Sequence, residues 1–118
     1  MNILNYIYIA LLFIAVDSVW LFLGSSLSHN MVKAIQGSPL VIRWLPAAVV
    51  YVALAYLVHI PKNNTQAFLL GLSTYAIYDF TNYAILDKYS LQFALMDSLW
   101  GGLLMTVVWN LSHYFKLL

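Results

Sequence analysis

Residues 3–24 read ILNYIYIALLFIAVDSVWLFLG, an apolar run that carries a single carboxyl group, that of Asp17. Its length matches the roughly 20 residues that a helix needs to cross about 30 Å of hydrocarbon. Open strands would leave backbone groups unsatisfied in lipid, so the run predicts a transmembrane helix. A signal-peptide core would avoid Asp17, and no Lys or Arg precedes the run. We therefore expect this helix to be retained.

Three further apolar segments follow the first along the chain. Together they predict a four-transmembrane-helix bundle, an all-α protein with one domain over residues 1–118 and helices over residues 3–24, 39–60, 65–86 and 91–115. The second helix has Trp44 as an alternative start, because Pro46 would kink a helix that begins at Pro39 or reset its start. Short polar turns separate the later segments, whereas the first connection runs from Ser25 to Ser38. Apolar residues recur there at every fourth position. This spacing allows a short interfacial helix or an ordinary loop.

The composition favours lipid as the solvent. Of the 118 residues, 64% are hydrophobic and 8% are charged, whereas a soluble domain is about 45–50% apolar and about 25% charged. The formal net charge is +1, so no basic field is present to attract nucleic acid. We expect a multi-pass integral membrane protein that has membrane lipids, and not nucleic acid, as partners.

Three of the four acidic residues lie within apolar segments. We name the side that carries the first and third connections face A, and the opposite side face B. At 1.5 Å per residue, Asp17 and Asp79 lie about 20 Å from face B, and Asp97 lies about 10 Å from face A. In a hydrocarbon layer about 30 Å thick, the three carboxyl groups share one level in the half toward face A.

Such a cluster needs a source of stabilisation. A charged side chain deep in a bilayer costs at least about 2.5–3.5 kcal/mol. Two neighbouring carboxylates rarely both ionise, so we expect at least one of the three groups to hold a proton. Proton relays and cation sites are built in this way. The alternative is that the aspartates only join helices by hydrogen bonds.

Polar and aromatic residues surround the aspartates in the sequence. On the third segment, Tyr75, Asp79, Asn82 and Tyr83 share one helix face through i, i+3 and i+4 spacing. This face adds two tyrosines and an amide to the candidate site. A carboxylate, amide and phenol set of this kind can hold a proton, a cation or a small polar solute.

Each of the first and last segments carries a tryptophan one turn after its aspartate. Asp17-Ser18-Val19-Trp20 and Asp97-Ser98-Leu99-Trp100 repeat one pattern on antiparallel helices. A tryptophan there can stack on a cation or close a pocket, and the alternative role is an interfacial anchor. Arg43 is the basic residue best placed to reach the aspartates, with extension of its side chain to the interface as the alternative.

Four motifs in this sequence resemble a known family of small four-helix membrane proteins, the domain of unknown function 2177 family. They are Asp17-x-x-Trp20-Leu21, Pro46-Ala47-Ala48, Tyr78-Asp79-x-Thr81-Asn82 and Asp97-x-x-Trp100-Gly101. The resemblance covers nearly the whole chain and implies four helices and membrane residence. It also implies that Asp17, Asp79, Asn82 and Asp97 are characteristic positions, and it adds Tyr78 and Thr81 to the candidate site. The family has no established activity, so the resemblance does not decide function.

The favoured hypothesis is a protein that binds or translocates a proton, a cation or a small polar solute. Asp79 is the expected central titrating group, with Asp17 and Asp97 tuning it. Four helices enclose little space, so a homo-oligomer is expected if a solute crosses. No cofactor is evident from the sequence.

Two alternatives belong to other functional classes. In a membrane enzyme, Asp17, Asp79 and Asp97 would hold Mg²⁺ or Mn²⁺, which prefer oxygen ligands, and the substrate would be a lipid or isoprenoid phosphate. The small number of basic residues disfavours this alternative, because a phosphate needs them. In a structural or accessory subunit, the aspartates would contribute to stability alone.

Overall fold

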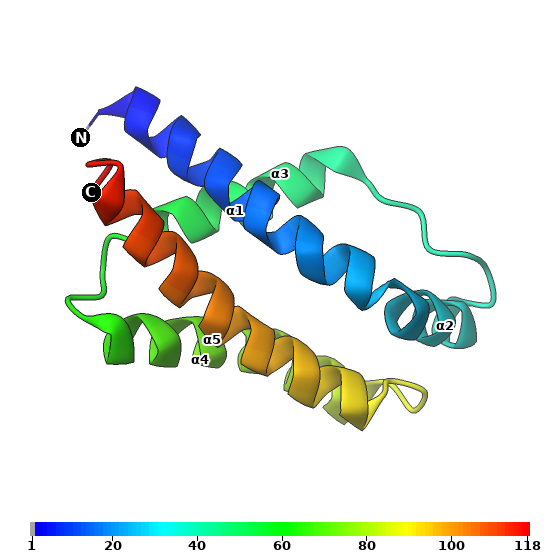
Figure 1. Ribbon diagram of the computed structural model, residues 1–118. Helices are drawn as coiled ribbons and strands as arrows, with labels where there is room; N and C mark the ends of the chain where they lie inside the picture. The colour runs from blue at the N-terminus through cyan, green and yellow to red at the C-terminus, as the bar shows by residue number, and fades with distance from the viewer. Residues whose placement is uncertain (1) are drawn as a thin grey trace.

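The computed structural model describes residues 2–118, which form five helices and, within that range, no strand (Figure 1). The helices are α1 (Ile3–Leu23), α2 (Ser25–Gln36), α3 (Trp44–Leu57), α4 (Asn64–Ile85) and α5 (Leu91–Tyr114). The expected all-α class is confirmed. By length and composition, α1 and α5 are candidate membrane spans.

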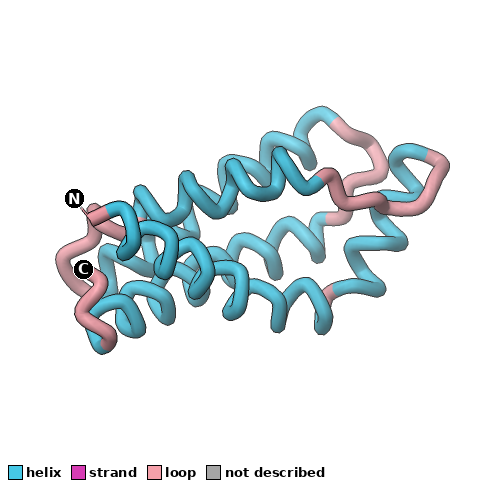
Figure 2. The backbone as a smooth tube through the Cα atoms, turned by 90° about the horizontal axis from the view of Figure 1, so that it is seen from above, coloured by secondary structure: helices cyan, strands magenta, loops and turns pink. Residues whose placement is uncertain are grey.

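The long helices form two packed pairs. α4 and α5 run antiparallel and make the most extensive contact in the molecule, and α1 packs against both α3 and α5. α3 and α4 have no extensive contact with each other. Both chain ends lie at one end of the bundle with the α3–α4 connection, and α2 lies at the other end (Figures 1 and 2). The end that carries α2 corresponds to face A.

Side-chain caps define where three helices begin. The side-chain oxygens of Asn2, Asn63 and Ser90 accept hydrogen bonds from the backbone N–H groups of Leu4, Gln66 and Phe93, at 2.9, 2.9 and 3.1 Å. Each cap satisfies one of the N–H groups that have no partner inside the helix. The sequence thus specifies the starts of α1, α4 and α5 locally.

Helix α3 begins at Trp44, the later of the two predicted starts, and it ends at Leu57 before the predicted residue 60. The preceding residues 39–43 are not helical. Pro46 is the third residue of α3, where a proline is tolerated because the N–H it lacks would have no partner within the helix. A start at Pro39 would have placed Pro46 in the helix interior, where it would remove a backbone hydrogen bond.

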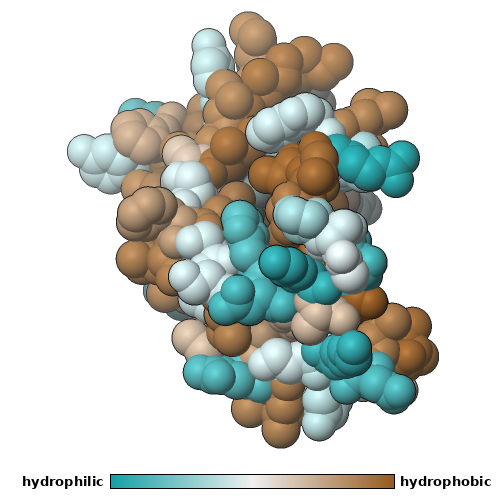
Figure 3. Space-filling model, turned by 90° about the vertical axis from the view of Figure 1, so that its right-hand side faces the viewer, coloured by the Kyte–Doolittle hydropathy of each residue, from teal (hydrophilic) through white to brown (hydrophobic). Residues whose placement is uncertain are grey.

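Helix α2 occupies most of the first connection, so the first of the two interpretations, a short helix, is correct. Met31 is its buried residue and packs in a cluster with Tyr89 and Phe93 at the start of α5. Gly37 ends the helix in the left-handed conformation, with φ of 75°, which glycine adopts without steric cost. Hydrophilic side chains gather on the surface at this end of the bundle (Figure 3).

The main apolar core lies on the face B side of the aspartates. Its buried members come from α1, α3, α4 and α5 and include Ile9, Phe13, Leu54, Ala55, Val58, Leu104, Met105 and Val108. Large apolar side chains also remain exposed on all the long helices, among them Leu21, Val49, Leu69, Ile77 and Leu103. Exposed apolar surface on every side is expected where lipid, and not water, is the solvent.

Candidate functional site

The three aspartates of the apolar segments come together in the interior, on α1, α4 and α5. Asp79 is 0% exposed, and Asp17 and Asp97 are each 7% exposed. Burial of this degree requires hydrogen-bond partners for the carboxyl oxygens. The structure supplies them from tryptophan, tyrosine and serine side chains.

The two Asp-Ser-x-Trp segments pair with each other across α1 and α5. The indole Nε1 of Trp20 donates to Oδ1 of Asp97 at 2.8 Å, and that of Trp100 donates to Oδ1 of Asp17 at 2.7 Å. The two indole rings lie 6.4 Å apart between centroids. Because the helices are antiparallel, each tryptophan reaches the aspartate of the opposite helix. The tryptophans therefore belong to the aspartate network and do not serve only as interfacial anchors.

Helix α3 adds a third donor to this network. The Tyr51 hydroxyl donates to Oδ2 of Asp17 at 2.6 Å, so both oxygens of Asp17 are satisfied. Sequence reasoning missed Tyr51. A signal was available, because Tyr51 lies about 10 Å into α3 from its start at 1.5 Å per residue, the depth estimated for Asp97.

Asp79 receives its donors from the α4–α5 turn and from α5. The Tyr89 hydroxyl donates to Oδ1 of Asp79 at 2.7 Å, and the Ser98 hydroxyl donates to Oδ2 at a longer 3.4 Å. Tyr89 belongs to the α4–α5 turn, and burial, reinforced by its hydrogen bond to Asp79, raises the pKa of its phenol above the ordinary value. Tyr89 therefore stays protonated and remains a donor to the carboxyl group.

The carboxyl groups of Asp79 and Asp97 lie within hydrogen-bonding reach of each other. Two carboxyl groups can share a hydrogen bond only when one of them carries a proton. Within residues 2–118, no Lys, Arg or His side chain donates to any of the three carboxyl groups, whose partners are indole, phenol and serine groups. The pair is thus arranged to hold one proton between two buried oxygens.

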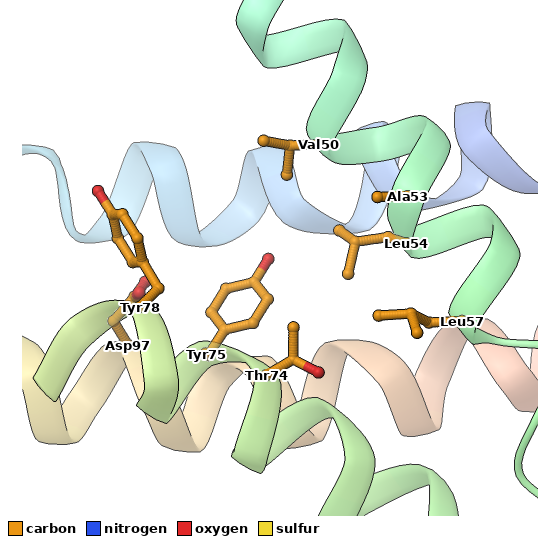
Figure 4. A pocket seen from close by; sticks show the side chains of 8 residues that line it. All are labelled: Val50, Ala53, Leu54, Leu57, Thr74, Tyr75, Tyr78 and Asp97. Carbon is orange, nitrogen blue, oxygen red and sulfur yellow. The ribbon is translucent and has the colours of Figure 1, made fainter. Parts of the chain in front are cut away.

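A cavity of about 430 Å³ between α3 and α4 reaches this pair (Figure 4). Asp97 forms part of its lining, together with Tyr75 and Tyr78 of α4. Asp97 is therefore the carboxyl group through which a molecule in the cavity could contact the network.

A comparison with known families bears on this site. The family model described as "Predicted membrane protein (DUF2177)" matches residues 2–114. The chain belongs to the DUF2177 family. This membership confirms the resemblance carried by the aspartate and tryptophan motifs. No curated protein and no solved structure matches the chain.

Several other candidate residues of this DUF2177 protein lie around the network rather than within it. Tyr75 is partly buried, and Tyr78 is exposed at the cavity. Asn82 is partly buried and lies within hydrogen-bonding reach of Tyr89. Thr81 and Tyr83 are exposed on α4. The shared helix face thus places Tyr75 and Asn82 near the carboxyl groups and leaves Tyr83 on the outside.

Arg43 does not join the network. It is exposed at the N-cap position of α3, and no hydrogen bond connects it to the aspartates in the part of the chain that the structure describes. The non-helical run over residues 39–43 keeps it at the end of the bundle, outside the interior. Extension to the interface is the behaviour that its exposure favours.

The metal alternative gains no support from the geometry. Among residues 2–118, no group of three or more His, Cys, Asp or Glu side chains could hold a metal ion. The oxygens of Asp17, Asp79 and Asp97 face indole, phenol and serine donors, whereas a divalent metal needs several oxygens turned toward one point.

The crossed pairing predicts a measurable loss of stability for Trp20→Phe. Phenylalanine keeps an aromatic ring but removes the donor to Asp97, and an unsatisfied buried acceptor costs about 1–3 kcal/mol. We expect a loss of this size in the free energy of unfolding, measured in bicelles. Trp44→Phe is the control, because Trp44 is exposed and such changes lie within about 0.5 kcal/mol. Equal losses in the two variants would show that the hydrogen bond contributes nothing.

Proposed function

We propose that this DUF2177 protein is a multi-pass membrane protein that binds protons at the Asp79–Asp97 pair and exchanges them with a cation or a small polar solute. The spans would be α1, α3, α4 and α5. α4 has 22 residues, enough to cross the hydrocarbon. α3 has 14 residues, about 21 Å of helix, and the apolar residues 40–42 before it would extend its path.

The observation that carries the proposal is a buried pair of carboxyl groups to which, within residues 2–118, no Lys, Arg or His side chain donates. Three aspartates, each at most 7% exposed, accept hydrogen bonds from neutral side chains. A purely structural contact between helices needs one hydrogen bond and no second carboxyl group. Two buried carboxyl groups within reach of each other, each accepting from neutral donors, form an arrangement in which a proton is bound and can be exchanged.

Access to the pair favours face A. Tyr89 connects Asp79 to the α4–α5 turn, at the end where hydrophilic side chains gather (Figure 3). Toward face B, Phe13, Leu104 and Met105 are buried in the apolar core. Passage across the membrane would therefore need a movement of helices. α3 is the helix best placed to move, because it packs against α1 and has no extensive contact with α4.

Proton flux in proteoliposomes tests this proposal. Wild type should dissipate an imposed pH gradient faster than protein-free liposomes, and Asp79→Asn at a matched amount of folded protein should not. The control is Asp87→Asn, because Asp87 is exposed in the α4–α5 turn and should leave the flux unchanged. Equal flux through wild type and Asp79→Asn would contradict the proposal. A homo-oligomer stays a prediction, and cross-linking in the same liposomes would detect it.

A further inference from the structure

The space between α3 and α4 is open to the side of the bundle. α3 packs against α1 and α4 packs against α5, with no extensive contact between α3 and α4. The cavity of about 430 Å³ lies between these two helices. Two of its lining residues, Val50 of α3 and Tyr78 of α4, are 51% and 61% exposed. In a membrane, such a cavity opens sideways toward lipid.

The two walls of the cavity differ in chemistry (Figure 4). α3 contributes an entirely apolar wall, made of Val50, Ala53, Leu54 and Leu57. α4 contributes the two phenol side chains and Thr74, whose hydroxyl donates to its own helix at the Leu70 carbonyl, 2.7 Å away. Small-molecule sites of about 300–1,000 Å³ have this character, mostly apolar with a few placed polar groups.

The charged residues that line the cavity determine whether its ligand is a cation or an anion. Asp97 is the one lining residue that can carry a charge at neutral pH, and no lining residue is basic. An anionic head group such as a phosphate would have no cationic partner there and would be repelled by an ionised Asp97. A cation would meet a carboxyl group with two aromatic rings beside it, those of Tyr75 and Tyr78, and aromatic rings with a carboxylate suit an alkylammonium group.

We propose that this cavity binds an amphiphilic organic ammonium ion that enters sideways from the bilayer. The head group would lie against Asp97, Tyr75 and Tyr78, and the hydrocarbon tail would lie along the apolar wall of α3, where its burial is favourable. This inference rests on the proposed function, because it names the solute that exchanges with the bound proton.

The exchange conserves charge. Before binding, the Asp79–Asp97 pair holds one proton and carries one negative charge. When one ammonium ion binds against the pair, one proton leaves toward the face A end through the neighbourhood of Tyr89. Both carboxyl groups are then ionised, with the ammonium ion as their cation. No bond other than that to the departing proton breaks.

Decyltrimethylammonium is a suitable probe, because it has no titratable proton of its own. In nanodiscs, with protein-free nanodiscs subtracted, we expect saturable binding to wild type and release of about one proton per bound ion, followed with a pH-sensitive dye. Decanol and decyl sulfate, which have the same tail with a neutral or an anionic head group, should release none. Asp97→Asn should lose proton release.

A tryptophan at the apolar wall tests the position of the tail. Ala53→Trp should weaken binding at least about tenfold, a change of about 1.4 kcal/mol, because the indole would fill the space of the tail. Val49→Trp is the matched control: Val49 is on the same helix, is 61% exposed and does not line the cavity. Its binding should equal that of wild type.

Several results would overturn the inference. They are an absence of saturable binding, equal binding by Ala53→Trp and Val49→Trp, and equal binding of decanol, which would indicate a space for lipid chains only. A further result would also overturn it: Ala53→Trp could lose cross-linked dimers while its cation binding stays unchanged. The space between α3 and α4 would then be a contact surface for a second copy of the chain. Asp79-dependent proton flux, measured with the same purified protein in proteoliposomes, separates the two claims. If that flux persists without cation binding, the inference fails and the proposed function stands.

Discussion

Asp79→Ala is expected to destabilise the fold by about 2–6 kcal/mol, because it leaves the buried Tyr89 and Ser98 hydroxyls without an acceptor, at about 1–3 kcal/mol for each unsatisfied group. It also removes the hydrogen-bonding neighbour of Asp97. Asp79 itself is 0% exposed, so water cannot replace the lost partner. The free energy of unfolding in bicelles measures the effect.

Asp79→Asn separates stability from proton binding at the same position. The amide has the shape of a protonated carboxyl group: its oxygen can accept from Tyr89, and its nitrogen can donate to Asp97. We expect its stability to fall within about 1 kcal/mol of wild type, the size of one typical net hydrogen bond. Asp87→Ala, in the exposed turn, is the control for the loss of a carboxyl group. Equal destabilisation by the alanine and asparagine substitutions at residue 79 would contradict the network as described.

Gly101→Ala is expected to be among the most disruptive single changes in the chain, because α4 and α5 meet at two glycines. A Cβ at Gly101 would lie 2.6 Å from the Cβ of Tyr75, and a Cβ at Gly71 would overlap the Gly101 carbonyl oxygen. Small residues allow this close approach of membrane helices. Overpacking of such a contact costs about 1–3 kcal/mol, and occasionally more.

The glycine contact also couples packing to the site. Moving α4 away from α5 would shift Tyr75 from the cavity and stretch the contact between Asp79 and Asp97. We expect Gly101→Ala to lower both the free energy of unfolding and the proton flux. Ala84→Leu, which adds volume at an exposed position of α4, should change neither quantity. A Gly101→Ala protein with wild-type stability would show that the helices can separate without cost.

Much of the fold follows from local signals in the sequence. The apolar runs and their polar turns predicted α1, α4 and α5 to within a residue or two at each end, since caps such as Ser90 act locally. The start of α3 stayed open between Pro39 and Trp44, and the structure has the later one, which places Pro46 in the first turn of the helix. The four-residue spacing around Met31 left a helix and a loop open, and packing against Tyr89 and Phe93 decides for the helix.

The sequence predicts how deep each site residue lies in the membrane, but not which side chains contact each other. Counting residues gives the depth of a side chain, so Asp17, Asp79 and Asp97 could be placed at one level. The partner of each aspartate depends on how the helices are rotated about their axes, which depth does not specify. The crossed bonds from Trp20 and Trp100 therefore could not be derived, although the repeated Asp-Ser-x-Trp pattern was visible.

The remaining misses have the same physical origin. Tyr51 and Tyr89 are donors from a different helix and from a turn, and tyrosine is common enough in membrane proteins to be read as an interfacial residue. Arg43 has a complementary charge and a suitable position in the sequence, but residues 39–43 are not helical and hold it outside the interior. The three buried carboxyl groups therefore accept hydrogen bonds from neutral indole, phenol and serine groups and not from Arg43.

The infrared C=O stretch of a protonated carboxyl group tests most directly whether Asp79 and Asp97 share a buried proton. In wild type at neutral pH we expect this band to be present. It should be diminished or lost in Asp79→Asn and in Asp97→Asn, and retained in Asp87→Asn. A wild-type spectrum without the band at neutral pH, or a band that both substitutions leave unchanged, would contradict a proton held between these two residues.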